Sequence, residues 1–109
     1  METNVLQDLY DVVLDRKQNK EEGSYTCYLF EKGIDKILKK CGEECTEMVI
    51  AAKNADNDEL KNEIADLFYH VMVMCAERGL EWSEVEEVLA ERSKKTGNLK
   101  KFHQVDKNT

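Results

Sequence analysis

Apolar residues recur every three or four positions along most of the chain, and this spacing predicts amphipathic helices. Long helices are predicted over about residues 3–18, 34–54 and 57–78. A loop at residues 19–26 and a short helical turn over about 27–32 separate the first two. With one more helix toward the carboxyl end, the pattern predicts an all-α fold, an antiparallel bundle of four to five helices.

Helix boundaries are predicted from capping residues. Asp56 or Asn57 caps the start of the helix at 57–78, and Gly79 ends it. The last helix is predicted to begin at Ser83, because Ser83 and Glu86 fit a capping box. Trp82 precedes this cap and is expected to pack onto the helix.

Apolar stripes on the two longest helices mark the faces that we expect to be buried. The run 71–76 is apolar on nearly all sides, and a helix of that kind is buried all round. In so small a chain, this burial predicts a second subunit packed on the run, so a homodimer is expected. The stripe residues are Ile34, Ile37, Leu38, Cys41, Cys45, Met48, Val49 and Ala52 in the first of these helices and Leu60, Ile64, Leu67, Phe68, Val71, Met72 and Cys75 in the second.

Composition indicates one soluble helical domain. The chain has 109 residues, no proline and only five glycines, and 36% of its residues are charged. We assign residues 1–95 to the domain and the lysine-rich stretch 96–109 to a polar tail. A formal net charge of −7 argues against general nucleic-acid binding, which needs a basic surface. No signal peptide and no membrane-spanning run are recognised, so no membrane association and a cytoplasmic location are expected.

The four cysteines, Cys27, Cys41, Cys45 and Cys75, form no Cys-x-x-Cys pair. Cys41, Cys45 and Cys75 fall at apolar-stripe positions, where a free cysteine behaves as a small buried hydrophobe. The alternative is a zinc site completed by His70. The core interpretation is the simpler one.

Two acidic clusters are the main candidate for chemistry. Glu43, Glu44 and Glu47 project together from one helix, and Glu63 and Asp66 project together from the next. The turn at 54–58 folds these helices back on each other, which would bring the clusters face to face. Converging carboxylates need a cation, and hard oxygen ligands suit Mg²⁺, with Mn²⁺ as an alternative. The other interpretation is a pair of solvated acidic helix faces.

Cationic side chains flank these clusters. Arg16 lies at the end of the first helix, where the helix dipole alone accounts for a cation, although a phosphate contact is the alternative. Lys36 and Lys40 precede Glu43 by one or two helical turns. They are either surface ion-pair partners or ligands for substrate phosphates beside a metal.

Hydroxyl groups and one histidine complete the candidates. Ser24, Tyr25 and Thr26 follow Gly23 and could bind phosphate or ribose, or simply cap the next helix. His70 lies one turn beyond Asp66. It is either an ordinary packed histidine or a second-shell group that orients a carboxylate.

This set of residues suits the hydrolysis of a phosphate anhydride. A divalent ion neutralises phosphate oxygens and lowers the pKa of a bound water. A glutamate that does not bind the metal can accept the proton of that water, and lysines and hydroxyls stabilise phosphate charge. No phosphate-binding glycine loop, His-Glu-x-x-His motif or nucleophile triad is present, so a covalent mechanism is not indicated.

The pair Glu43-Glu44-x-x-Glu47 and Glu63-x-x-Asp66 resembles the signature of the all-α nucleoside triphosphate pyrophosphohydrolases. A more specific resemblance, over about residues 5–92, is to the phosphoribosyl-ATP pyrophosphohydrolases of histidine biosynthesis. It is carried by the segments Arg16-Lys17-Gln18-Asn19, Glu22-Gly23-Ser24-Tyr25-Thr26, the run 32–44 and Ala65-Asp66-Leu67-x-Tyr69-His70.

This resemblance implies Mg²⁺-dependent hydrolysis of phosphoribosyl-ATP to phosphoribosyl-AMP and pyrophosphate by a homodimer. It implies metal binding by Glu44, Glu47, Glu63 and Asp66, with Glu43 as an additional acid. Lys36, Lys40 and the loop Ser24-Tyr25-Thr26 would contact the substrate. The alternatives are a housekeeping nucleoside triphosphate pyrophosphohydrolase of other specificity and a non-catalytic helical dimerisation module.

Overall fold

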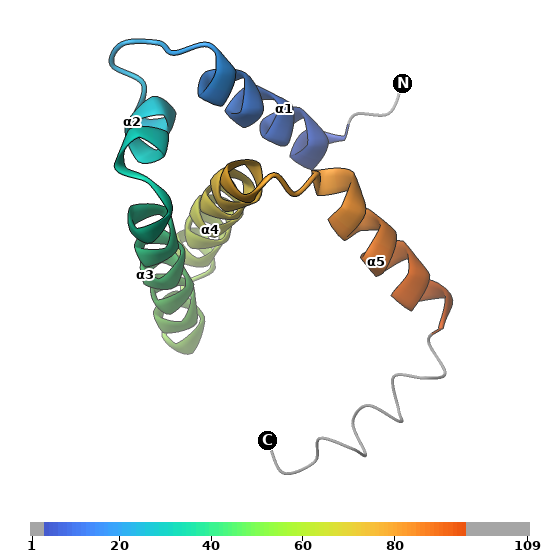
Figure 1. The fold of residues 1–109 in the computed structure, drawn as a ribbon. Coiled ribbons are helices and arrows are strands. Elements are labelled where there is room, and N and C mark those ends of the chain that lie inside the picture. Colours follow the sequence, from blue (N-terminus) through green and yellow to red (C-terminus); the bar gives the residue numbers. More distant parts are fainter. Residues whose placement is uncertain (1–3, 96–109) are drawn as a thin grey trace.

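Five α-helices make up the computed structural model, which describes residues 4–95 (Figure 1). They are α1 (Val5–Gln18), α2 (Tyr25–Lys32), α3 (Ile34–Lys53), α4 (Asn57–Arg78) and α5 (Trp82–Lys94). The all-α prediction is confirmed, and the helix boundaries agree with the predicted ones to within one or two residues. The predicted tail at 96–109 lies outside the described residues.

The turn between α3 and α4 is as predicted. Asp56 caps α4 by accepting a hydrogen bond from the main-chain N–H of Glu59 at 3.1 Å, and Ala55 adopts a φ of 57°. Gly79 ends α4 in the left-handed conformation, with a φ of 74°. The turn at 54–56 places α3 and α4 antiparallel and side by side (Figure 1).

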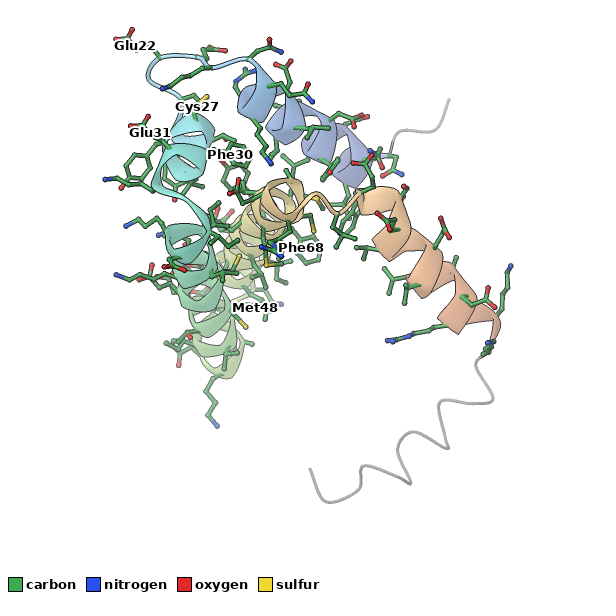
Figure 2. The ribbon with its side chains drawn as sticks, viewed as in Figure 1. Glu22, Cys27, Phe30, Glu31, Met48 and Phe68 are labelled. Atoms are coloured by element: carbon green, nitrogen blue, oxygen red, sulfur yellow. The ribbon has the colours of Figure 1, made fainter. Side chains whose placement is uncertain are left out.

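The core lies where α1, α2 and α3 pack against the second half of α4. Its largest fully buried side chains come from all four helices: Tyr10, Val13, Leu29, Ile37, Met72 and Val73. Phe30 points from α2 toward this core, whereas Glu22 and Glu31 point outward (Figure 2). The apolar run 71–76 is buried or half-buried as expected. Other helices of the same chain bury this run, so the inference that the run requires a second subunit is wrong.

The predicted capping box at Ser83 and Glu86 is also wrong. Helix α5 begins one residue earlier, at Trp82, and its capping box joins Glu81 and Glu84. Trp82 is only 8% exposed, so the first turn is placed by burial of this ring in the core. The Tyr10 hydroxyl then holds the preceding residues, donating toward the carbonyl of Leu80 at 3.0 Å and the carboxylate of Glu81 at 2.9 Å.

Part of the predicted apolar stripe is exposed. On α3 the inward face is Ile37, Cys41, Glu44, Met48 and Ala51, all buried or half-buried. The predicted stripe residues that directly follow these inward positions on α3 are exposed: Leu38, Cys45, Val49 and Ala52. Phe68 on α4 is exposed as well. The core prediction for Cys45 is therefore wrong, whereas Cys75 is buried and Cys41 half-buried; all four cysteines are free thiols.

Candidate active site

Three carboxylates converge between α3 and α4. Glu44, Glu63 and Asp66 each present an oxygen, and these oxygens lie within 4.8 Å of one another. Glu44 comes from the inward face of α3, while Glu63 and Asp66 are one turn apart on α4. The antiparallel pairing predicted from the turn thus brings together three of the four predicted metal ligands.

Burial leaves two oxygens of this cluster without a partner. Glu44 is only 7% exposed, and neither its Oε2 nor Oε1 of Glu63 accepts a hydrogen bond. Leaving buried carboxylate oxygens unpaired costs free energy. In the described part of the chain only one further buried side-chain nitrogen or oxygen, Nε1 of Trp82, is also unpartnered. The donor set is all oxygen and anionic, so these residues fit a hard divalent cation.

Glu47 and Glu59 extend the acidic surface. A hollow of about 310 Å³ lies beside the cluster and is lined partly by Glu47, Asp56, Glu59 and Glu63. The neighbouring carboxyl group of Glu59, burial, and the neighbouring carboxyl group of Glu47 raise the pKa of Glu63 from 4.5 to about 7. Glu47, the fourth predicted ligand, thus lies against Glu63. Glu59 was missed in the sequence, although it precedes Glu63 by four residues and so shares its helix face.

Lys40 connects the cluster to its neighbours on α3. Its ammonium lies 3.3 Å from Oε1 of Glu43 and 3.8 Å from Oε1 of Glu44. Burial lowers the pKa of Lys40, but the hydrogen bond to Glu43 and the nearby anionic groups outweigh this effect, and the pKa is raised overall. Lys40 is therefore a cation at the rim of the site. Glu43 is exposed and paired with Lys40, outside the three-carboxylate cluster.

The hydroxyls at 24–26 all have partners within the chain. Ser24 caps α2 by accepting a hydrogen bond from the N–H of Cys27 at 3.2 Å, so the capping role that was left open is present. The Thr26 hydroxyl bonds the Tyr69 hydroxyl, and the Tyr25 hydroxyl lies 3.1 Å from Nε2 of His70. These contacts fix the start of α2 against α4.

His70 lies beside the cluster but does not orient a carboxylate. It is 5% exposed, and its Nδ1 bonds the main-chain carbonyl of Asp66 at 2.8 Å rather than the Asp66 carboxylate. The position of His70 therefore agrees with the alternative of a packed, hydrogen-bonded histidine, and its ring contacts the main chain of Asp66. Tyr25 and Tyr69 both lie edge-on to the His70 ring.

The remaining predicted binding residues lie further out. Arg16 pairs with Asp15 at 3.0 Å and Glu21 at 3.3 Å, so it braces the loop after α1 instead of contacting the cluster. Lys36 is half-buried one turn before Lys40 on α3. Lys36 therefore lies at the Lys40 end of the site.

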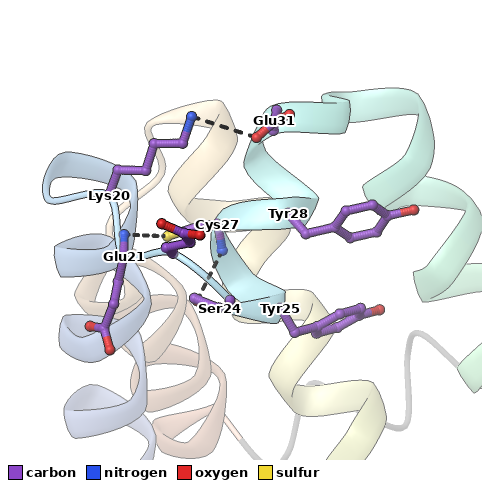
Figure 3. Close-up of a pocket in the computed structure, with 9 residues that line it drawn as sticks. Lys20, Glu21, Ser24, Tyr25, Cys27, Tyr28 and Glu31 are labelled. Carbon is purple, nitrogen blue, oxygen red and sulfur yellow. Dashed lines mark hydrogen bonds and ion pairs between the residues drawn. The ribbon is translucent and has the colours of Figure 1, made fainter.

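A larger hollow of about 790 Å³ opens along the loop before α2 (Figure 3). Lys20 and Glu31 pair across it at 3.6 Å. The Tyr25 and Tyr28 rings stack with their centroids 6.0 Å apart, and their hydroxyls point in the same direction (Figure 3). The residues that line this hollow are Lys20, Glu21, Glu22, Gly23, Ser24, Tyr25, Cys27, Tyr28 and Glu31.

Comparison with known families identifies the relatives of this site. The sequence model of the phosphoribosyl-ATP pyrophosphohydrolase family matches residues 6–93. The chain belongs to this family. Proteins named phosphoribosyl-ATP pyrophosphatase are similar over most of their length. That of Streptococcus thermophilus is 57% identical over 95 residues, covering 87% of this chain and 91% of the relative.

Two further relatives of the same name extend the match. The Clostridium novyi protein is 52% identical over 97 residues, covering 89% of this chain and 88% of its own. The Streptococcus sanguinis protein is 52% identical over 102 residues, covering 94% and 98%. The family model, over residues 6–93, reaches all five helices. No helix in the described stretch 4–95 has both the length and the apolar character needed to cross a membrane.

Proposed function

We propose that this protein hydrolyses phosphoribosyl-ATP to phosphoribosyl-AMP and pyrophosphate, the second step of histidine biosynthesis. Family membership supports the reaction. The observation that carries the proposal for this site is the convergence of Glu44, Glu63 and Asp66, with two buried oxygens left unpaired. Solvated acidic faces would not place carboxylates in this way, because unpaired buried anions are costly.

The proposed cofactor is Mg²⁺, with Mn²⁺ as a substitute. Glu44, Glu63 and Asp66 would hold it, joined by Glu47 from the adjoining hollow. When bound, the ion neutralises phosphate oxygens and lowers the pKa of a coordinated water. Glu43 is exposed and lies outside this set of ligands, so it is the carboxylate available to accept the proton of that water.

The substrate phosphates would bind at the Lys40 end of the site. Lys36 and Lys40 lie one turn apart on α3, and both can donate to phosphate oxygens. Lys40 would exchange its contact with Glu43 for a phosphate contact, since that contact is at the exposed rim. The hollow beside Ser24 and Tyr25 offers space for the remainder of the nucleotide.

A homodimer is proposed on the basis of the exposed apolar surface. Leu38, Val49 and Phe68 are 47%, 57% and 42% exposed, and α5 adds Val88 and Leu89 at 49% and 57%. Burying these residues against a second copy would remove the surface that the single chain leaves uncovered.

A cytoplasmic location is inferred from the free thiols. All four cysteines are unpaired, as is usual where thiols are kept reduced.

The test is pyrophosphate release from phosphoribosyl-ATP, with ATP and dUTP as comparison substrates, in Mg²⁺ and in EDTA. Release confined to phosphoribosyl-ATP and abolished by EDTA is expected. Glu63→Gln should lower kcat/KM by about 100-fold or more, because even the partners of metal ligands contribute about 10–100-fold. Glu91→Gln on α5, which loses only a surface contact with Lys95, is the matched control and should keep full activity.

The other outcomes discriminate between the alternatives. Release from ATP or dUTP but not from phosphoribosyl-ATP would make the protein a housekeeping pyrophosphohydrolase. No release from any of them, with Glu63→Gln folded like the parent, would leave a helical dimerisation module and refute the enzymatic proposal.

A further inference from the structure

Two neighbouring contacts fasten the start of α2 to α4. Tyr25 bonds His70, and the next residue, Thr26, bonds Tyr69, which precedes His70. Both contacts join side chains more than 40 residues apart in sequence. Both are made by tyrosine hydroxyls, so each is removable by a Tyr→Phe change that keeps the ring. They differ in that only the Tyr25 contact leads to the carboxylate cluster.

The direction of the Tyr25 hydrogen bond follows from the other nitrogen of His70. Nδ1 bonds a carbonyl oxygen, that of Asp66, and a carbonyl only accepts, so Nδ1 carries the hydrogen. In the neutral ring Nε2 is then an acceptor. The Tyr25 hydroxyl must therefore donate to Nε2, at 3.1 Å.

Tyr25 also interacts with the charge of Lys40. Burial raises the pKa of Tyr25, the Lys40 charge partly offsets this rise, and Glu44 adds to it. Lys40 in turn lies 3.8 Å from Oε1 of Glu44. Two hydrogen bonds thus join the main chain of Asp66 to His70 and His70 to Tyr25, and the charge of Lys40 acts on both Tyr25 and Glu44. Asp66 and Glu44 are two of the three converging carboxylate residues.

We propose that Tyr25 and His70 are positioning residues for the carboxylate site, holding the α3 ligand Glu44 and the α4 ligand Asp66 in register before a cation binds. The proposal rests on the cation site of the proposed function. Three carboxylates within 4.8 Å repel one another, so contacts that hold their positions favour cation binding. Tyr25 and His70 act on Asp66 through its main-chain carbonyl and on Glu44 through the charge of Lys40.

The decisive comparison is Tyr25→Phe against Tyr69→Phe. Each variant loses one hydroxyl and one α2–α4 hydrogen bond, so a role limited to docking α2 predicts equal effects. The Kd for Mn²⁺ is measured without substrate, from the electron paramagnetic resonance signal of the free ion, and melting temperatures are measured alongside. Tyr25→Phe should weaken Mn²⁺ binding about 10-fold, the lower end for partners of metal ligands. Tyr69→Phe should change it less than threefold at a similar melting temperature.

His70→Phe supplies the second arm. If Tyr25 acts through His70, the double variant Tyr25→Phe/His70→Phe should bind Mn²⁺ no more weakly than His70→Phe alone. The Tyr25 and Tyr69 comparison stands without this arm should His70→Phe fold poorly, because both tyrosine variants keep their rings.

Equal Mn²⁺ affinities in Tyr25→Phe and Tyr69→Phe would overturn the positioning role. So would a Tyr25→Phe variant with parental Mn²⁺ affinity and a raised KM, which would instead make Tyr25 a substrate contact. Absence of Mn²⁺ binding by the parent protein would refute the cation site itself. Mn²⁺ binding without hydrolysis of phosphoribosyl-ATP would refute only the proposed substrate.

Discussion

Glu44→Gln should reverse sign in its effect on stability when a divalent cation is added. Glu44 is 7% exposed, its Oε2 has no partner, and it lies within 4.8 Å of Glu63 and Asp66. Without a cation, neutralising it relieves repulsion among three carboxylates but removes the contact with Lys40 at 3.8 Å. With a cation, the variant loses a ligand. The metal-free and metal-bound proteins should therefore respond in opposite directions.

The magnitude follows from binding linkage. The lost contact with Lys40 costs only about 0.2–1 kcal/mol, and the relieved repulsion offsets it, so the metal-free variant should be at least as stable as the parent. A cation at 100 times its Kd stabilises the parent by about 2.7 kcal/mol. If Glu44→Gln weakens binding 100-fold, the same concentration adds only about 0.4 kcal/mol. The difference of about 2.3 kcal/mol corresponds to roughly 9–18 °C in melting temperature for a domain near this size.

Thermal melts in EDTA and in increasing Mn²⁺ measure this directly. Glu91→Gln is the control, because Glu91 pairs only with Lys95 on the exposed surface of α5. It should show the same Mn²⁺-dependent rise as the parent. A parent melting temperature that Mn²⁺ leaves unchanged, or equal rises in the parent and Glu44→Gln, would refute a cation held by Glu44.

Three further predictions concern the fold, the site and the assembly. Lys17→Met should lower the free energy of unfolding by about 1 kcal/mol in urea denaturation, because its ammonium caps the end of α4 through the carbonyl of Ala76 at 2.9 Å; an unchanged midpoint would contradict this. In EDTA, the free energy of unfolding should fall as pH rises from 4.5 through about 7, because the folded state holds a proton on Glu63 that the unfolded state releases at a lower pH. Thermal melts at pH 5 and 8 should show a smaller fall for Glu63→Gln than for the parent. Equal falls would exclude Glu63 as the origin of the pH dependence. Val49→Asp should give a monomer in sedimentation velocity if the exposed face of α3 is the dimer contact, and an unchanged dimer would move the contact elsewhere.

The helices and the α3–α4 turn could be predicted because their signals are local. Asp56 caps α4 from three residues before Glu59, and Gly79 ends it in the conformation that glycine favours. The start of α5 could not be predicted in this way. Ser83 has the better local cap signal, but burial of Trp82 in the core and the bond from Tyr10 to Glu81 select the earlier start. Both contacts come from distant parts of the chain.

The apolar stripe of α3 was predicted one position too far along for part of its length. Residues 100° apart on a helix belong to neighbouring faces, and α3 carries apolar residues on both. The face that packs within the chain includes Glu44, which a hydrophobic pattern assigns to the surface. The other face, with Val49, stays exposed. Apolar spacing alone does not distinguish a face buried within the chain from a face left for a partner.

The acidic cluster was predictable because its geometry needs only two helix faces and one turn. The contacts of the Tyr25 and Thr26 hydroxyls were not, since their partners His70 and Tyr69 lie more than 40 residues further on. A loop rich in hydroxyls before a helix looks the same in sequence whether it binds phosphate or holds two helices together. Here the Thr26 and Tyr25 hydroxyls are both bonded to α4, so each contributes to docking α2 on α4. The Tyr25→Phe and Tyr69→Phe pair is informative for this reason: equal stability losses with unequal cation affinities would show that the Tyr25 contact affects the carboxylates beyond its part in docking α2.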